Sequence, residues 1–501
     1  MISLECATPA SIRSPIRKNS ILLWYICVFF AALIVSCQPI GEKTELASST
    51  PMQPAQTYTQ TKTITATPSA TPTPTATPPE YLQITPEALS KITVEFWHPW
   101  SGIVARQIDT LIKEFNLNNE WGIIVSITTQ GSAGELSNRV EASLEDQDGL
   151  PDIVVAPMDQ ILAWQTINPD AVVVLNNYSD SPMWGLSKAE LADIPFQFLK
   201  QSTNGEDLLS LPAQRSAEVL FYNQSWAAEM GFDDPPENPV EFMEQACAAA
   251  QTLDEDETRE NDGLGGWIIN TDPNVLLSWL YAFGAEDLPE KETQTYLFNT
   301  PVGRETFSYL RALYDDGCAW VSRDATSYEY FANRQALFYS GTLQDLPLQE
   351  RTNSRLQVYD QWTILPYPAQ EVKPIVLISG PSYVILRSTP EEQLASWLFI
   401  RWLNQPLNQT RMVQVSNTLA LGAASTQMMD VYAGHHPQWK ESLFWMPMGR
   451  STPQQANWRV VRNILGDAGW QTFQTYITAE DIPAILTQLD EMIIEVLRHL
   501  E

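Results

Sequence analysis

Aromatic and hydrogen-bonding side chains follow the first strand-like run of the chain. Residues 92–96 alternate apolar and polar side chains, which is typical of a strand, and after them come Trp97, His98, Trp100 and Ser101. Aromatic rings can stack on the C–H face of a sugar, while imidazole and hydroxyl groups can bond its hydroxyls. We expect the last three of these residues to face a ligand cleft, whereas Trp97 packs in the core.

The elements that must position these side chains follow a regular order. Residues 123–127 and 153–155 read as two more strands, with helical spacing of apolar residues between successive strands. Strands that alternate with helices are typical of a parallel α/β sheet. Ligands of such sheets lie beyond the carboxyl ends of the strands, so the loops 97–102, 130–134 and 156–160 are candidates for the site.

Two of these loops and one later run add candidate ligand contacts. Gly131 and Ser132 open a helix, where backbone N–H groups can bind a hydroxyl or an anion. The alternative is that Ser132 is an ordinary N-cap. Trp164 either stacks on a ligand or packs its helix, and Trp267, which opens an apolar run, is a candidate for the cleft.

Catalytic motifs are missing from the sequence. It contains no G-x-S-x-G elbow, no H-E-x-x-H and no phosphate-binding G-x-x-x-x-G-K-[ST] loop. A glycoside hydrolase needs two opposed carboxylates, and 60 acidic residues make such a pair easy to imagine but do not locate it. The four histidines have no zinc-site spacing, so we expect neither a metal nor another cofactor. A non-enzymatic binding protein is favoured, and a secreted hydrolase is the weaker alternative.

Length and charge limit the functions further. The 501 residues suffice for a large core, and the formal net charge is −31. This charge repels polyphosphate and excludes nucleic-acid binding as a function. It also disfavours strongly anionic ligands.

The N-terminus predicts export and lipid anchoring. Basic residues precede the uncharged run 21–36, which is short for a membrane-spanning helix and typical of a secretory signal peptide (residues 1–36). The run ends in Ile-Val-Ser-Cys, which looks like a bacterial lipobox with Cys37 as the lipidated residue. The alternative is an uncleaved membrane anchor. Both place the rest of the chain outside the cytoplasmic membrane, and lipidation would hold it at the outer face of that membrane.

The composition after the signal peptide predicts a disordered linker, and it leaves two cysteines in the exported part. Residues 37–88 are rich in Thr and Pro, cannot bury a core and are predicted to be a disordered tether to a solute-binding domain at 89–501. Cys247 and Cys318 are the cysteines left in the exported part. A disulfide between them is open, because sequence does not show whether they meet.

Several motifs of the region 90–501 occur in the order of a known family. They read ITVEFWHPWSG, LPDIVVAPMDQILAW, LPAQRSAEVLFYNQSWAAEMGFDDPPENPVEF, FNTPVGRETFSYLRALYDDG, FANRQALFYSG and ISGPSYVIL. With these motifs the chain resembles the extracellular solute-binding proteins, family 1, of bacterial ABC importers, which include the maltose-binding proteins. Each motif is weak by itself, and their order over about 400 residues carries the resemblance.

The resemblance implies a type II periplasmic-binding-protein-like α/β fold. Its two lobes are expected at 90–212 with 374–412, and at 213–373 with 413–501. They are joined by a hinge that the chain crosses three times, and a ligand binds in the cleft between them. Lobe closure over the ligand would present the protein to membrane permease subunits.

The implied function is capture of a carbohydrate for import, by a protein that we expect to be a monomer. The alternatives are a glycerol phosphodiester or a polyol as ligand, or the same fold serving a sensor as an adaptor.

Matching the family's motifs adds candidate contacts. Asp159 falls where sugar-binding members carry a hydroxyl-binding carboxylate, and Trp458 falls where they carry a stacking ring. Arg215 and Ser216 lie at the first crossing, where the family often places a polar contact; the alternative for Arg215 is a salt bridge to Glu218. The remaining candidates, at the second crossing and after a strand of the second lobe, are Gly380, Ser382, Tyr383, Ser340 and Gly341. Many members carry a Trp just after the latter glycine, but residues 342–344 are Thr, Leu and Gln, which departs from a maltodextrin-type platform.

Overall fold

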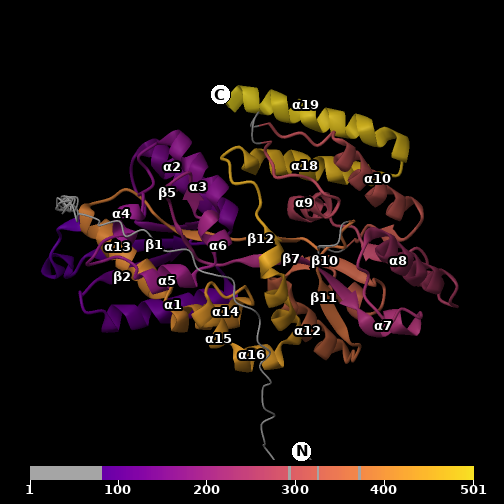
Figure 1. The fold of residues 1–501 in the computed structure, drawn as a ribbon, viewed down its shortest axis with the longest axis horizontal. Helices are drawn as coiled ribbons and strands as arrows, with labels where there is room; N and C mark the ends of the chain where they lie inside the picture. Colours follow the sequence, from indigo (N-terminus) through magenta and orange to yellow (C-terminus); the bar gives the residue numbers. More distant parts are fainter. Residues whose placement is uncertain (1–81, 291–294, 324–325, 371–373, 501) are drawn as a thin grey trace, which may run out of the picture. The chain divides into compact units, whose positions relative to one another are not determined.

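The computed structural model describes residues 82–290, 295–323, 326–370 and 374–500 (Figure 1). The predicted signal peptide, Cys37 and most of the predicted linker lie outside the described residues. In the part that is described, no helix combines the length and the apolar character needed to cross a membrane.

A five-stranded sheet organises the first lobe. Its order is β2-β1-β3-β13-β6, formed by β1 (Thr93–His98), β2 (Ile124–Thr129), β3 (Ile153–Ala156), β6 (Leu211–Pro212) and β13 (Ser382–Ile385). β1 pairs in parallel with β2 and β3, while β13 runs antiparallel to β3 and β6. The predicted parallel arrangement of the first three strands is confirmed, and their carboxyl ends share one edge.

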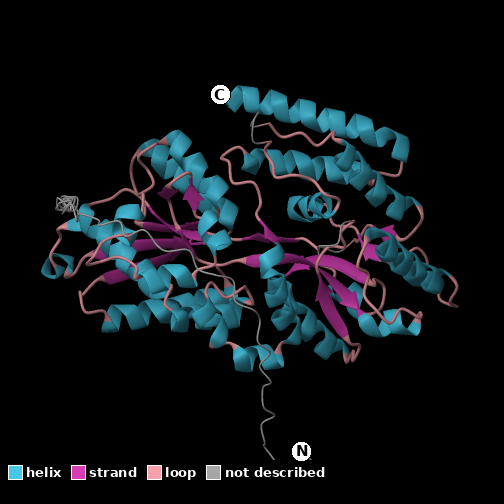
Figure 2. Ribbon diagram, in the orientation of Figure 1, coloured by secondary structure: helices cyan, strands magenta, loops and turns pink. Residues whose placement is uncertain are grey.

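Helices cover both faces of this first sheet (Figures 1 and 2). α1 (Gly102–Asn118) and α13 (Pro390–Leu403) pack on the face that includes Phe96, and α2 (Ala133–Asp146) and α3 (Met158–Ile167) pack on the face that includes Trp97. β3 is buried on both faces, which explains its uninterrupted apolar sequence. The shorter elements of this lobe are α4 (Asn176–Ser179), α5 (Lys188–Asp193), α6 (Phe196–Lys200), β4 (Thr203–Asn204) and β5 (Asp207–Leu208).

A second, seven-stranded sheet organises the other lobe. Its order is β14-β12-β7-β10-β8-β9, with β11 also paired to β7. The strands are β7 (Ser216–Asn223), β8 (Trp267–Ile268), β9 (Ala319–Trp320), β10 (Phe338–Thr342), β11 (Trp362–Leu365), β12 (Val376–Ser379) and β14 (Gly449–Arg450). β8 is parallel to β9 and β10, whereas β7 is antiparallel to β10. The amino end of β7 therefore lies at the same edge as the carboxyl ends of β8 and β10.

Two hydrophobic layers sandwich the second sheet. The larger layer includes residues of α8 (Pro239–Asp254), α9 (Pro273–Ala282), α10 (Pro301–Asp315), α18 (Trp458–Thr472) and α19 (Ile482–Leu500). Figure 1 draws α18 and α19 at the top and α8 at the right. The other layer includes residues of α11 (Tyr328–Ala332), α12 (Leu346–Leu356), α16 (Asp430–His435) and α17 (Pro437–Ser442). The remaining helices are α7 (Gln224–Glu229), α14 (Pro406–Ser416) and α15 (Ala423–Gln427).

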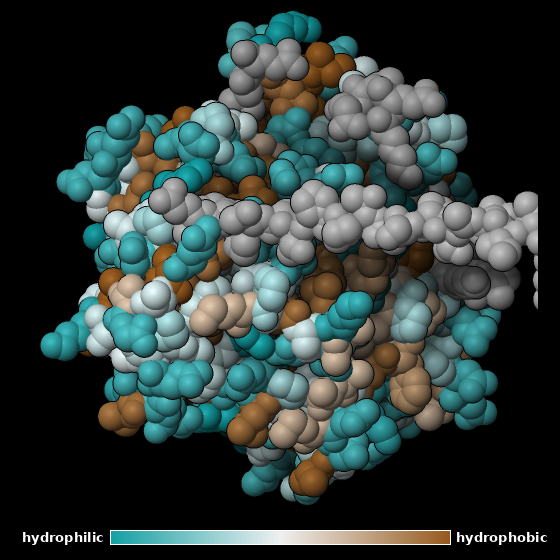
Figure 3. All heavy atoms as spheres, turned by 60° about the vertical axis from the view of Figure 1, so that its left-hand side comes forward, coloured by the Kyte–Doolittle hydropathy of each residue, from teal (hydrophilic) through white to brown (hydrophobic). Residues whose placement is uncertain are grey.

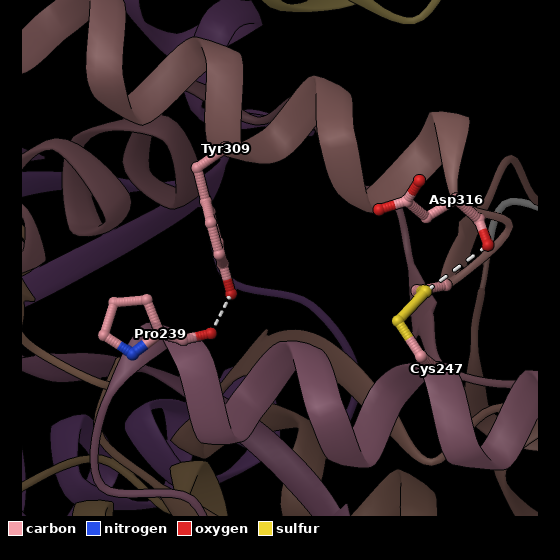
Figure 4. The surroundings of a disulfide bond; sticks show 5 residues. Pro239, Cys247, Tyr309 and Asp316 are labelled. Atoms are coloured by element: carbon pink, nitrogen blue, oxygen red, sulfur yellow. Dashed lines mark hydrogen bonds between the residues drawn. A yellow bond between two sulfur atoms is a disulfide. The ribbon is translucent and has the colours of Figure 1, made fainter.

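A disulfide joins two elements of the second lobe (Figure 4). Cys247 of α8 pairs with Cys318, just before β9, so the pairing that the sequence left open is present. The hydroxyl of Tyr309 on α10 also donates a hydrogen bond of 2.7 Å to the carbonyl of Pro239, the first residue of α8. α8 is thus held at its first residue by α10 and near its middle by the disulfide.

The chain passes between the sheets at three places. It leaves the first sheet after Pro212 and enters the second at Ser216, and it returns between Ser379 and Ser382. The third passage follows α14, which packs on α1 before Leu419 joins the core of the second lobe. Residues 376–379, which fell inside the expected first-lobe segment 374–412, pair with β7 in the second sheet.

The packed structure begins before residue 89, where the solute-binding domain was expected to start. Leu82 is buried, and the short 3₁₀ helix Pro86–Leu89 places Leu89 in the same core as α1. The packed structure therefore begins a few residues earlier than the expected boundary at residue 88. The segment 82–89 contains too few apolar residues to show a periodic pattern in the sequence.

The surface is mostly polar where Figure 3 displays it. Hydrophilic residues dominate this face, and apolar residues are interspersed among them. A polar, net acidic surface favours solubility.

Candidate functional site

A cavity of about 420 Å³ lies where α18 of the second lobe meets α2 and α3 of the first. Arg459, Arg462 and Asn463 line it from α18, because their spacing puts them on one helical face. Across from them are residues of α2 and of the β3–α3 segment, which include Ser137, Asn138, Glu141, Pro157, Gln160 and Trp164. We call this space the interlobe cavity. Its lining combines hydrogen-bonding side chains with one large aromatic residue, Trp164, which is the composition expected of a site for a polar ligand.

Two ion pairs connect the lobes at this cavity. Arg459 pairs with Glu141, which also accepts a hydrogen bond of 2.8 Å from Gln160 Nε2. Arg462 Nη1 lies 3.5 Å from Asp159 Oδ2. Both arginines belong to the second lobe and both carboxylates to the first, so these contacts form only when the lobes are together.

Asp159 sits in the first turn of α3 and is 5% exposed. Burial raises the pKa of its carboxyl, and the neighbouring Arg462 and Arg459 oppose that rise. Oδ2 accepts no hydrogen bond from the described residues, so it keeps capacity for a hydroxyl donor.

Trp164 lines the interlobe cavity with a fully buried ring. Its Nε1 has no hydrogen-bond partner among the described residues. Of the residues that the sequence analysis selected, Asp159 and Trp164 are thus brought to the same region. Ser132 is instead the N-cap of α2, in a capping box with Glu135, and both Gly131 and Ser132 are exposed.

His98 and Trp100 form a buried cluster at the carboxyl end of β1. The two ring centroids are 5.2 Å apart, and the indole Nε1 donates to Gln214 Oε1 at 2.8 Å. Burial lowers the pKa of His98 to about 4, so the imidazole is neutral near pH 7. Its Nε2 and the Nε2 of Gln214 have no partners in the described part of the chain. Ser101 is exposed at the start of α1.

Arg215 does not face a ligand. Its side chain is 0% exposed and donates to the carbonyls of Gln214, Gly380 and Pro381, and to Ser382 Oγ at 3.0 Å. The alternative salt bridge to Glu218 is not formed, and the guanidinium bonds backbone carbonyls and serine hydroxyls instead. Sequence could not reveal this, because the partners are backbone carbonyls of a distant segment.

The second crossing is built around the same arginine. Gly380 is required there, because a Cβ would lie 2.2 Å from the carbonyl oxygen of Gln214. Ser382 is buried against Arg215, and Tyr383 is buried in the first-lobe core. Ser216, on the other strand, is half-buried and its Oγ has no partner among the described residues.

Trp267 and Trp458, the two second-lobe tryptophans selected from the sequence, lie in the core. Trp267 is fully buried and donates from Nε1 to Ser340 Oγ at 3.3 Å, and Gly341 follows in a half-buried position. Trp458 is 2% exposed and stacks on Tyr296 at a centroid distance of 5.8 Å. The expectation of an exposed stacking ring at Trp458 is wrong in this structure, since α18 starts with the ring turned into the core and presents the next residue, Arg459, to the cavity.

Sequence reasoning missed several polar residues of this region. Gln214, Glu141, Arg459 and Arg462 had no motif to mark them, although the i, i+3 spacing of the arginines on a helix was visible. Glu218 was considered only as a partner for Arg215. Within the described residues, no group of three or more His, Cys, Asp or Glu side chains is arranged to hold a metal ion.

Comparison with solved structures shows where this fold recurs. A cyclic alpha-maltosyl-1,6-maltose binding protein from Arthrobacter globiformis is 18% identical, with a TM-score of 0.66, and the match covers 81% of this chain and 99% of that one. The sugar-binding protein MalE from Xanthomonas citri is 17% identical with a TM-score of 0.68, at the same coverage. UgpB from Mycobacterium tuberculosis, solved with glycerophosphocholine, is 15% identical with a TM-score of 0.66, again at 81% and 99%. These matches confirm the predicted two-lobed fold.

The family follows from the sequence itself. Among curated proteins, none matches the chain. The model of the family described as "Bacterial extracellular solute-binding protein" matches residues 110–442, well over half of the chain. This match agrees with the family resemblance in the order of the motifs and with the two-lobed fold. The chain therefore belongs to the bacterial extracellular solute-binding proteins.

Proposed function

We propose that the protein is the substrate-binding component of an ABC importer. It captures a carbohydrate between its lobes, without catalysing a reaction, and delivers it to the membrane permease. The observation that carries this proposal is the interlobe cavity, because a polar cavity lined by both lobes couples ligand binding to lobe closure. Several of the similar structures are of sugar-binding or sugar-bound proteins, which supports a carbohydrate as the ligand class.

The cavity's lining also fits a sugar chemically. The carboxylate, amide and guanidinium groups of the lining residues can bond the hydroxyls of a sugar. A glycerol phosphodiester is the second candidate ligand, since Arg459 and Arg462 supply two cationic groups and UgpB was solved with glycerophosphocholine. Their pairing with Glu141 and Asp159 makes the neutral sugar the better fit.

Attachment to the outer face of the cytoplasmic membrane through lipidated Cys37 belongs to the same proposal. The Thr/Pro-rich linker would let a monomeric domain reach its permease while remaining anchored. Substituting Cys37→Ala should release the protein from the membrane fraction. Retention of this variant would favour the uncleaved anchor instead.

A thermal-unfolding panel tests the ligand class. Sugars, oligosaccharides, polyols and glycerol phosphodiesters are added in turn, and a compound that binds the folded state raises the unfolding midpoint by mass action. We expect a shift with one class of sugar, and that sugar should be recovered unchanged. Consumption of the compound would favour a hydrolase over a binding protein. A shift with phosphodiesters only would identify a glycerol phosphodiester as the ligand.

A further inference from the structure

Glu218 on β7 is a buried carboxyl without a partner. It is 7% exposed, and no described residue donates a hydrogen bond to it or forms an ion pair with it. Burying a carboxyl without a hydrogen-bond partner is unfavourable, and least so when the group is neutral. A hydrogen-bonding ligand from outside the chain would offset this cost.

Glu218 belongs to a row of polar side chains, each with at least one polar atom that has no hydrogen-bond partner among the described residues. Strand alternation puts Ser216 and Glu218 on one face of β7, while Ala217 and Val219 face the opposite core. Gln214 precedes them at the same two-residue spacing, in the crossing segment. Ser216 Oγ and Gln214 Nε2 have no hydrogen-bond partner among the described residues. At about 3.3 Å per residue, the row extends over about 13 Å.

The row lies where the two sheets meet. Glu218 is opposite Thr342, the last residue of β10, so it belongs to the edge formed by the carboxyl ends of β8 and β10. At the other end of the row, Gln214 Oε1 accepts a hydrogen bond from the indole Nε1 of Trp100 in the first lobe. Figure 1 shows β7 and β12 at this junction between the lobes. Ligands of open α/β sheets bind at such carboxyl edges.

We propose that Glu218 is a ligand-binding residue whose neutral carboxylic acid donates one hydrogen bond to, and accepts others from, an uncharged polyhydroxy ligand, with Ser216 and Gln214 bonding the same ligand along the row. This inference rests on the proposed function and adds that the ligand is uncharged where it meets the second lobe at this row, whose residues lie outside the lining of the interlobe cavity.

Burial and two nearby carboxylates favour the neutral form of Glu218. Burial is the main cause that raises the pKa of its carboxyl well above the usual value, and Asp272 at the N-cap of α9 and Asp345 before α12 raise it further. Tyr367, which follows β11, is also fully buried within electrostatic reach of Glu218. Neither β10 nor β12 presents a titratable side chain to it. A protonated carboxyl can donate to a hydroxyl, as an ionised one cannot.

The test uses the full chain and named probes. Maltose, maltotriose and sorbitol are the uncharged probes, and glucosamine and choline are the cationic ones; affinities are measured by calorimetry from about pH 5 to pH 9. The variants are Glu218→Gln, which keeps a neutral donor and acceptor, Glu218→Leu, which keeps the volume, and Ser216→Ala. Because Glu218→Leu could fail to fold, its unfolding midpoint is measured beside that of Glu218→Gln.

We expect an uncharged probe to bind best at low pH, with affinity falling as the pH rises through the raised pKa of Glu218. Glu218→Gln should bind with wild-type affinity at low pH and lose the pH dependence, and folded Glu218→Leu should bind about tenfold or more weakly. Ser216→Ala should bind about two- to fivefold more weakly.

Three outcomes would overturn the inference. If the sugar binds with equal affinity to the wild type and to Glu218→Leu, Glu218 is not a contact, while the proposed function stands. If a cationic probe binds, tightens with rising pH and is lost in Glu218→Gln, the ligand is a cation. If no uncharged polyhydroxy probe binds, the inference and the proposed carbohydrate function fail together.

Discussion

The Asp159 carboxylate of the first lobe lies 3.5 Å from the Arg462 guanidinium of the second. One turn earlier on α18, Arg459 pairs with Glu141. These two pairs hold α18 against α2 and α3 at the mouth of the interlobe cavity. They can therefore contribute to ligand affinity by stabilising the closed arrangement, even without touching the ligand.

Substituting Arg462→Gln should weaken ligand binding modestly. Arg462 is partly exposed, so the pair is worth about 0.2–1 kcal/mol, which corresponds to a rise in Kd of about 1.4- to fivefold. Calorimetry with the ligand found by the thermal panel measures it. Arg498→Gln, which removes an exposed pair with Glu495 on α19, serves as the control and should leave Kd unchanged. Equal affinity in both variants would contradict a closing role.

The stability of the ligand-free protein should depend on pH through Glu218. An unfolded glutamate titrates near 4.5, whereas the pKa of Glu218 in the folded protein is well above that value. Between these pH values the folded state holds a proton that the unfolded state has lost, so stability falls as pH rises. Glu218→Gln removes this loss. The variant should therefore be more stable than the wild type at about pH 8, and the gain should shrink as the pH approaches about 4.

Denaturant unfolding at several pH values measures this difference. Glu120→Gln on the exposed surface is the matched control, with no expected gain. A pH-independent effect of Glu218→Gln would mean that Glu218 is ionised in the folded protein.

Substituting Arg215→Met should destabilise the fold by about 3–5 kcal/mol, because it removes the side-chain donor that the buried carbonyls of Gln214 and Gly380, one in each crossing, share. Guanidinium unfolding gives the value, with exposed Arg355→Met as the control near zero. Unchanged stability with lost ligand binding would instead restore Arg215 as a ligand contact.

Substituting Trp458→Ala should also act on stability, by about 3–5 kcal/mol, since the ring is buried against Tyr296. Trp470→Ala, which removes an exposed ring from the same helix, should change little. A variant of Trp458 that keeps its unfolding midpoint but loses sugar binding would show that the ring turns toward a ligand.

Removing the Cys247–Cys318 disulfide should destabilise the second lobe. The bridge closes a loop with a sequence separation of 71, for which chain entropy gives about 4 kcal/mol. The double variant Cys247→Ala with Cys318→Ala should unfold at lower denaturant than the oxidised wild type. A reducing agent should bring the wild type to the same midpoint and leave the variant unaffected.

Much of the fold could be predicted because its determinants are local. The alternation of residues 92–96, the apolar run of β3 and the helical spacing on α1 each depend on which face is buried, and that pattern is written along a few consecutive residues. The order of the motifs then supplied the two-lobed arrangement, which the similar structures confirm.

The candidate site was harder to predict because its contacts join distant segments. Asp159 was selected, but its partner Arg462 is 303 positions later and carries no motif. Trp458 and Arg459 are neighbours in sequence, yet the helix turns the first into the core and the second to the cavity. Only the rotation of α18 decides between them, and one sequence does not fix that rotation.

Arg215 finally determines how the lobes can move. Its side chain bonds the carbonyls of Gly380 and Pro381 in the second crossing, and its own carbonyl accepts a bond of 2.7 Å from Leu419 N in the third. All three connecting strands are thus pinned at a single residue. Sliding or splaying of one connecting segment past the others would break these bonds together, so we expect the three segments to move as one unit when the lobes open.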